Sequence, residues 1–189
     1  MTEAFSSIII EAYLSGAWVD LWADVLHSPR PRVSGMGIMG NTLMDRIGDA
    51  GTFTFSLDNS LYNSASTLGY YTPEGINVRS GWRPGVPVRV SFTYDGYKKY
   101  KYYGTIDSDG IEVVPFQYGK RRVNVKCSNW MAKAANHTLT LMDYHTNYRA
   151  DQGLQQVLDN MTPRPQKVHL GVGANTFPTV FDITRTNTK

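Results

Sequence analysis

The alternation of apolar and polar residues with a period of two limits the fold of this chain more than any other feature. Its clearest instance is the segment GTFTFSLDNS at residues 51–60, in which Phe53, Phe55 and Leu57 alternate with threonine and serine. A period of two places successive side chains on opposite faces of a β-strand, so one face can be buried. The Asp-Asn-Ser sequence that follows favours a turn, because these side chains hydrogen-bond to nearby backbone groups. We therefore predict a half-buried strand that runs into a turn.

Further segments with strand character lie on both sides of residues 51–60. The predicted strands and turns are residues 7–14 and 17–26 around Ser15-Gly16, residues 86–94 and 97–106 around Asp95-Gly96, residues 111–118 after Asp109-Gly110, and residues 121–127 after Gly119-Lys120. The last four segments predict a four-stranded meander of the kind found in small antiparallel barrels and sandwiches. In the predicted strand 17–26, one face carries Val19, Leu21, Ala23 and Val25, and the other carries Trp18, Asp20, Trp22 and Asp24.

Long loops and a change of pattern near residue 128 divide the chain. Residues 27–50 contain Pro29, Pro31 and a predicted helical turn over residues 41–47, and residues 61–83 read as a second long loop. Helix formers then appear in residues 129–135 and 151–161, the latter with an apolar stripe of Leu154, Val157, Leu158 and Met161. We predict a mainly β, tail-tube-like antiparallel barrel or sandwich with one or two short helices toward the C-terminus. Residues 1–130 form the barrel domain, with loops 27–50 and 61–83, and residues 131–189 form a helix-containing extension that begins a further domain.

The bulk composition excludes several classes of protein. The 189 residues carry a net charge of only +3, which argues against a dedicated nucleic-acid binder. Cys127 is the only cysteine, so the sequence excludes an internal disulfide framework and a cysteine-rich zinc site. The apolar run at residues 8–10 is too short for a signal peptide or a membrane span, and we expect synthesis in the cytoplasm with no membrane association.

No arrangement of residues predicts catalysis, a cofactor or a metal. The segment GMGIMG at residues 35–40 matches a dinucleotide fingerprint by letter but lacks the surrounding strand-turn-helix unit. Residues that were weighed for chemistry are His27, His137, His145, His169, Asp20, Asp24, Asp107, Asp109 and Cys127. The histidines show no zinc spacing, the aspartates fit polar strand faces and turns, and Cys127 fits an apolar strand face. We therefore predict that the chain is not an enzyme.

Aromatic and basic side chains supply the candidate interface residues. The chain contains twelve tyrosines, and aromatic residues make up 12% of it. The candidates are Tyr62, Tyr70 and Tyr71 in the second loop, Trp82 at its end, and Lys98, Lys99 and Lys101 in the strand 97–106. Lysines between tyrosines can hold a single-stranded nucleic acid, but lysines also protect an exposed strand edge from aggregation. The low net charge favours the second interpretation.

The order of these features resembles the N-terminal region of tail-tip or baseplate hub proteins of tailed bacteriophages. The segments that carry the resemblance, within residues 8–161, are VDLWADV, GTFTFSLDNS, GYYTPEG, RPGVPVRVSF, YGTID, VNVKCSNWMAKAA and DQGLQQVLDNM. The resemblance implies a tail-tube-like β-barrel that forms part of an axial ring between tail tube and tip. The chain is shorter than a full hub, which fits a fragment and leaves a trimer, or a hexamer as in related distal tail proteins, open.

The resemblance also implies partners and a location. The partners are further copies of the chain and other tail proteins, with no sequence-specific contact to DNA that passes through the lumen, and the location is the tail of the virion. It supplies no catalytic residues. One alternative is a carbohydrate-binding β-sandwich that uses Trp18, Trp22 and Trp82 as platforms. Another is a glycosidase built on paired aspartates, for which the sequence shows no convergent set of residues.

Overall fold

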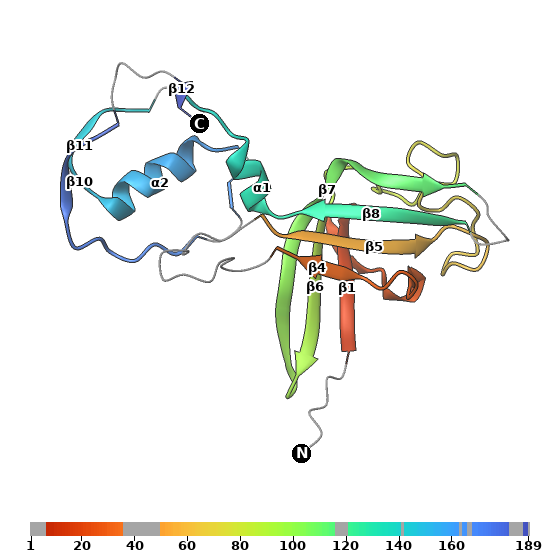
Figure 1. Cartoon of the computed structure of the whole chain (residues 1–189). Coiled ribbons are helices and arrows are strands. Elements are labelled where there is room, and N and C mark those ends of the chain that lie inside the picture. Colours follow the sequence, from red (N-terminus) through yellow and green to blue (C-terminus); the bar gives the residue numbers. More distant parts are fainter. Residues whose placement is uncertain are drawn as a thin grey trace. The chain divides into compact units, whose positions relative to one another are not determined.

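The fold is described from a computed structural model of the chain. It describes residues 7–35, 50–115, 121–140, 142–162, 164–165, 168–181 and 187–188. The chain divides into two compact units, Met1–Met131 and Ala132–Lys189 (Figure 1). Three predicted features lie outside the described residues: the helical turn over 41–47, the turn at Gly119-Lys120, and the segment GMGIMG apart from Gly35.

The first unit consists of one antiparallel sheet. Its strands are β1 (Ser7–Leu14), β2 (Ala17–Asp20), β3 (Val25–Leu26), β4 (Arg32–Ser34), β5 (Thr52–Asp58), β6 (Pro87–Tyr94), β7 (Tyr97–Val114) and β8 (Arg122–Ser128). They follow the order β2-β1-β6-β7-β8-β5-β3, with β4 also paired to β5. The sheet curls into a half-barrel (Figure 1). The prediction of a mainly β, antiparallel fold with short helices is confirmed.

The register of the sheet determines which side chains enter the core. Ile10 lies opposite Val90 between β1 and β6, and Phe53 lies opposite Cys127 between β5 and β8. All four side chains are buried. Residues one position away, such as Glu11, face the outside because side chains alternate along a strand. The alternation predicted for residues 51–57 is therefore confirmed, with Phe53, Phe55 and Leu57 in the core.

Strand β7 differs from the prediction, because residues 97–114 form one strand of 18 residues instead of two strands and a turn at Asp109-Gly110. Its first part pairs with β6 and its second part with β8, and the β8 ladder shifts register between Ile106 and Ile111. A Cβ atom at Gly104 would collide with the Ser128 carbonyl oxygen, and one at Gly110 would collide with the Lys126 carbonyl oxygen. Glycine thus lets β7 approach β8 where the sheet bends (Figure 1).

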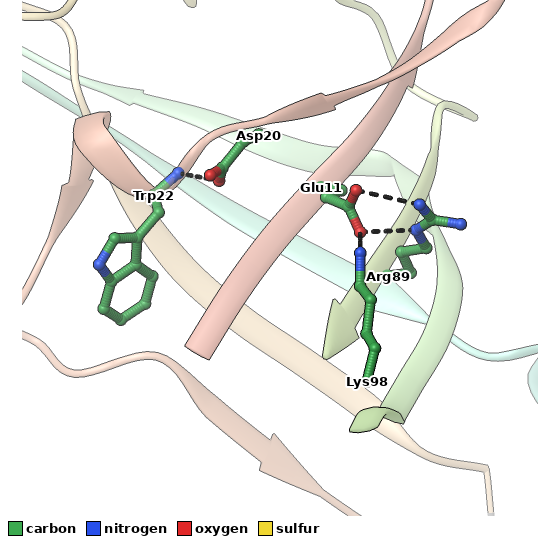
Figure 2. Close-up of polar contacts among 5 residues, drawn as sticks. All are labelled: Glu11, Asp20, Trp22, Arg89 and Lys98. Carbon is green, nitrogen blue, oxygen red and sulfur yellow. Dashed lines mark hydrogen bonds and ion pairs between the residues drawn. The ribbon is translucent and has the colours of Figure 1, made fainter. Parts of the chain in front are cut away.

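The predicted strand 17–26 is also wrong in its second half. Strand β2 ends at Asp20, whose Oδ1 accepts a hydrogen bond from the Trp22 backbone N–H at 2.8 Å (Figure 2). A 3-10 turn, η1 (Trp22–Asp24), follows before β3. Asp24 is buried and Ala23 is exposed, the reverse of the predicted alternation. The Asp24 carboxylate accepts hydrogen bonds from the backbone N–H and the hydroxyl of Ser64, and this long-range contact decides the local conformation.

The segment between β5 and β6 contains no helix or strand, as predicted for residues 61–83. Hydrogen bonds from buried side chains hold it in place. Asn59 donates to the Thr72 hydroxyl at 2.8 Å and accepts from the Tyr71 backbone N–H at 2.8 Å. Asn63 donates to the carbonyl oxygens of Ser60 and Thr67. The loop is therefore an anchored part of the first unit.

The second unit is small and contains two strand pairs. Its elements are β9 (Leu139–Thr140), β10 (His145–Arg149), α2 (Ala150–Asn160), β11 (Thr176–Val180) and β12 (Asn187–Thr188), while α1 (Trp130–Ala135) spans the boundary of the units. Strands β10 and β11 pair antiparallel, as do β9 and β12. Both predicted helices are confirmed within a residue or two. In the predicted stripe, Leu158 and Met161 are buried but Leu154 is exposed. Within the described part of the chain, no helix is long and apolar enough to cross a membrane.

Candidate interaction surface

The outer face of β2, β1, β6 and the first part of β7 carries a continuous group of charged and aromatic side chains. We call it the aromatic face, and it consists of Glu11, Tyr13, Trp18, Arg89, Lys98, Tyr100 and Tyr103. The register brings these residues together, since Glu11 lies opposite Arg89, Tyr13 opposite Trp18, and Arg89 opposite Tyr103. Strand alternation then turns all of them away from the core.

Glu11 is the centre of the charged part of this face (Figure 2). Its Oε2 accepts from Arg89 Nε at 2.7 Å and from Lys98 Nζ at 3.0 Å, and its Oε1 accepts from Arg89 Nη2 at 3.0 Å. Only 9% of Glu11 is exposed. The bond from Arg89 holds the pKa of the Glu11 carboxyl below its usual value against the opposing effect of burial, and Lys98 adds to the lowering. The same bond raises the pKa of Arg89. A buried carboxylate on an outer face is thus neutralised within the chain.

The Arg89 guanidinium also packs between aromatic rings. It lies 4.1 Å from the Trp18 ring centroid and 5.2 Å from that of Tyr100. Trp18 in turn packs against Tyr13 at 5.2 Å and Tyr103 at 5.9 Å between ring centroids. Cation–π contacts of this kind attract the guanidinium to the faces of the rings. With 59% of Tyr100 exposed, the result is a partly exposed aromatic surface of the composition found in protein interfaces.

The structure brings only one of the predicted lysines into this face. Lys98 binds Glu11, whereas Lys99 alternates to the opposite face of β7, with its Nζ 5.6 Å from the Tyr97 ring centroid. Lys101 is exposed. It lies where the β6–β7 ladder shifts register, between Tyr102, which pairs with Val90, and Tyr100, which pairs with Ser91. The three lysines therefore do not form one basic patch.

The aromatic candidates in the second loop separate into exposed and buried residues. Tyr62 is 89% exposed, and Tyr70 is half-buried with its ring centroid 5.3 Å from the Arg79 guanidinium. Tyr71 and Trp82 were predicted at an interface, but the structure buries both. Hydrogen bonds hold both side chains inside. The Tyr71 hydroxyl donates to Asp24 and accepts from Arg79 at 2.7 Å. The Trp82 indole N–H donates to the Tyr71 carbonyl oxygen at 3.0 Å. Burial raises the pKa of Tyr71.

The residues weighed for catalysis take part in structural contacts. Asp24 anchors the second loop, and Asp107 accepts from the Ser128 hydroxyl at 3.0 Å. Cys127 is buried, and burial raises the pKa of its thiol, so the reactive thiolate is disfavoured. His145 stacks on Tyr148 at 4.1 Å between ring centroids. Among the described residues, no group of three or more His, Cys, Asp or Glu side chains is placed to hold a metal ion.

Sequence reasoning missed Glu11, Tyr13 and Arg89, although each lies in a predicted strand. The signal that could have found them is the pairing of residues 7–14 with residues 86–94, which faces Glu11 toward Arg89. Register between strands so far apart in sequence is not encoded by alternation alone.

No family model matches the chain, and no curated protein sequence matches it. The solved structures that are similar to the chain include the following two. The crystal structure of the prophage MuSo2 43 kDa tail protein from Shewanella oneidensis has a TM-score of 0.46 and 13% identity, over 81% of this chain and 37% of that chain. The PdpA-VgrG complex of Francisella has a TM-score of 0.43 and 11% identity, over 91% of this chain and 22% of that chain. The chain thus spans well under half the length of either protein, and no residue role is carried over from them.

Proposed function

We propose that this chain is a structural protein of a phage tail tip or baseplate hub and forms part of an axial ring that joins the tail tube to the tip. The order of sequence motifs supports this role, and the mainly β, antiparallel half-barrel agrees with it. The observation that carries the proposal is the aromatic face beside strand β2. The two solved structures named above, at TM-scores below 0.5, do not enter the argument.

The edges of the sheet support assembly through β2. Among the described strands, β2 pairs only with β1, so its outer edge offers backbone hydrogen-bonding groups to a neighbour. The opposite edge, formed by β3 and β4, is interrupted by Pro29 and Pro31, which have no N–H to donate. A ring needs one surface that meets a different surface on the next copy. The β2 edge and the aromatic face supply one such surface for a trimer or a hexamer.

The proposal includes that the chain is not an enzyme. Two of the four candidate aspartates are engaged in structural contacts, since Asp24 binds Ser64 and Tyr71, and Asp107 binds Ser128. A carbohydrate-binding module is the rival with a specific observation in its favour, because rings of the aromatic face are exposed. Arg89 covers the Trp18 ring at 4.1 Å, however, and Trp82 is buried. A sugar platform needs an open ring face, so the geometry favours a protein interface.

Sedimentation equilibrium of the purified chain tests the proposal. We expect a species of three or six times the chain mass, because closed rings are the common outcome of such interfaces. Tyr100→Ser should shift the equilibrium toward monomer, since it removes an exposed ring from the aromatic face. Tyr144→Ser is the matched control, as it removes an exposed ring that belongs to neither the aromatic face nor the predicted interface set. A stable monomer that binds sugars on a glycan array would contradict the ring and favour the carbohydrate module.

A further inference from the structure

A groove of about 580 Å³ is hollowed in the outer face of β4, β5, β8 and the second part of β7. We call it the cationic groove, because Arg30, Arg32, Arg122 and Lys126 line it together with Glu112 and Asn124. It lies in the first unit, on strands other than those of the aromatic face, and its residues have no place in the proposed ring contact.

The register explains why these side chains meet. Arg32 lies opposite Thr54, and Thr54 lies opposite Lys126, which places the three on one row across β4, β5 and β8. Asn124 precedes Lys126 by two residues on β8, so it points to the same side of the sheet. It lies opposite Glu112 of β7. Alternation turns these side chains outward while their neighbours Phe53 and Val125 are buried. Most of the groove therefore follows from the register of the sheet, and Pro29 and Arg30 are added by the segment between β3 and β4.

The three arginines of the groove are not paired with carboxylates in the part of the chain that the structure describes. Within the described residues, no ion pair or hydrogen bond joins Arg30, Arg32 or Arg122 to another side chain, and Lys126 has only a long contact of 3.9 Å to Asp107. Arg122 Nε is buried and has no acceptor. The Arg122 guanidinium is therefore not committed to a structural ion pair, unlike that of Arg89. The acidic Glu112 is held to the side by Asn124 Nδ2 at 2.8 Å.

The aromatic face shows how an arginine on this sheet is satisfied, since both oxygens of Glu11 accept from Arg89. In the cationic groove, neither Glu112 nor Asp109 forms an ion pair with an arginine among the described residues. Ser56 and Asn124, which are joined by a hydrogen bond of 2.9 Å, add uncharged polar groups to the lining of the groove. Such groups can contact the backbone of a polypeptide. Glu112 and Asp109 in the same groove would repel a continuous polyanion such as a nucleic acid strand.

We propose that the cationic groove binds a carboxylate-bearing segment of a partner protein, with Arg32 and Arg122 as the residues that hold its carboxylates. A planar guanidinium binds a carboxylate through two parallel hydrogen bonds, which gives both strength and orientation. The inference does not rest on the proposed ring, because its residues and its partner differ from those of the β2 edge.

The test is fluorescence anisotropy with fluorescein-labelled hexaglutamate and, separately, a labelled thymidine hexanucleotide, both at low salt and with the full chain. We expect hexaglutamate to bind more tightly than the oligonucleotide. Arg32→Gln and Arg122→Gln should each weaken hexaglutamate binding about tenfold, because each removes one charge-assisted pair. Arg83→Gln is the matched control, as Arg83 is exposed, does not line the groove and carries the same charge. It should leave the affinity unchanged.

Glu112→Gln gives a gain of affinity that a purely structural role would not produce. It removes a negative charge from the groove and keeps an oxygen that can accept from Asn124. We expect tighter hexaglutamate binding. Circular dichroism melts establish that each variant is folded. Arg32 is exposed, so we expect Arg32→Gln to disturb the fold least. Three results would each overturn the proposal: no binding of hexaglutamate, equal binding of the oligonucleotide, or an equal loss in Arg83→Gln.

Discussion

The outer faces of the two halves of the sheet carry similar charged groups, but the groups are satisfied in different ways. On the aromatic face, Glu11 is buried and accepts three hydrogen bonds from Arg89 and Lys98. In the cationic groove, Glu112 is exposed, and Arg122 has a buried Nε without an acceptor. On the first face, the chain itself supplies a carboxylate for Arg89 and Lys98. For the arginines of the second, we propose that a partner protein supplies it.

This difference teaches that the same strand geometry can produce a structural ion pair or a binding site. Both faces rest on antiparallel ladders in which alternate residues point outward. What differs is whether the residue opposite each arginine binds it. Arg89 lies opposite Glu11, which accepts two hydrogen bonds from it, whereas Arg32 lies opposite the uncharged Thr54. Arg122 lies opposite Asp58, whose Oδ1 accepts instead from the Ser60 backbone N–H at 2.8 Å. Charges that are paired across a ladder stabilise the fold, and charges that are not paired remain available to a partner.

The largest loss of stability is expected from a substitution in the core, because both outer faces belong to the sheet that this core holds together. Phe53→Lys places a charge in the core beside Cys127 and Tyr102 and should abolish folding, since burial of an unpaired charge costs more than about 5 kcal/mol. Thr54→Lys is the matched control, because Thr54 is the exposed neighbour on the same strand. Circular dichroism and urea denaturation measure both variants. If Phe53→Lys folds like the wild type, the assignment of this core is wrong.

The next largest effect is expected at Glu11, and the same substitution at Glu112 gives the comparison. Glu11→Gln should lower the free energy of unfolding by about 1–3 kcal/mol, because it removes a buried carboxylate from a bidentate ion pair. Glu112→Gln should change it by less than about 0.5 kcal/mol, since Glu112 is exposed. Urea denaturation at neutral pH gives both values. Equal losses in the two variants would remove the distinction between the faces.

Acid should reveal the same ion pair in the wild-type protein. The pKa of Glu11 is lowered in the folded chain from its usual 4.5, so the unfolded chain takes up this proton at a higher pH than the folded one. The stabilisation from Glu11 is therefore complete above about pH 4.5 and is lost as the pH falls through the folded value. Stability curves of wild type and Glu11→Gln should converge as the pH falls. Curves that stay parallel would contradict this role, because all other carboxyl groups are common to both proteins.

The smallest effect on stability is expected in the cationic groove. Arg122→Gln should leave the free energy of unfolding within about 0.5 kcal/mol of the wild type or raise it, because it removes a buried donor that has no acceptor. Arg89→Gln, its counterpart on the aromatic face, should be clearly destabilising because Glu11 loses two hydrogen bonds. Thermal melts of the two variants measure the contrast. A large loss of stability in Arg122→Gln would show that the groove arginine is structural.

Sequence alone predicted the elements whose causes are local. The alternation of Phe53, Phe55 and Leu57 gave the correct core strand, and the helix formers after residue 150 gave α2. The errors arose where a distant residue decides the local structure. Asp24 leaves the predicted strand because Ser64, forty positions later, binds its carboxylate. Asp109-Gly110 looks like a turn, but β7 continues through it and pairs with β8 on both sides, at Ile106 and again from Ile111.

The candidate site was harder to predict for the same reason. Tyr62 and Tyr71 are both tyrosines of one loop, and only the buried partners Asp24 and Arg79 make Tyr71 internal. Glu11 and Arg89 are 78 positions apart, and their pairing requires the register of β1 with β6. Composition and alternation predict which residues can face outward. They do not predict which outward residues meet.

The long strand β7 has a consequence for how the molecule responds to force. Its 18 residues are hydrogen-bonded to β6 at one end and to β8 at the other, so the two halves of the sheet are joined by a continuous covalent backbone. Because β7 belongs to both ladders, loss of the hydrogen bonds to β6 or to β8 alone still leaves the two halves tethered through its backbone. We expect force across the sheet to load the irregular stretch of β7 between Ile106 and Ile111 first.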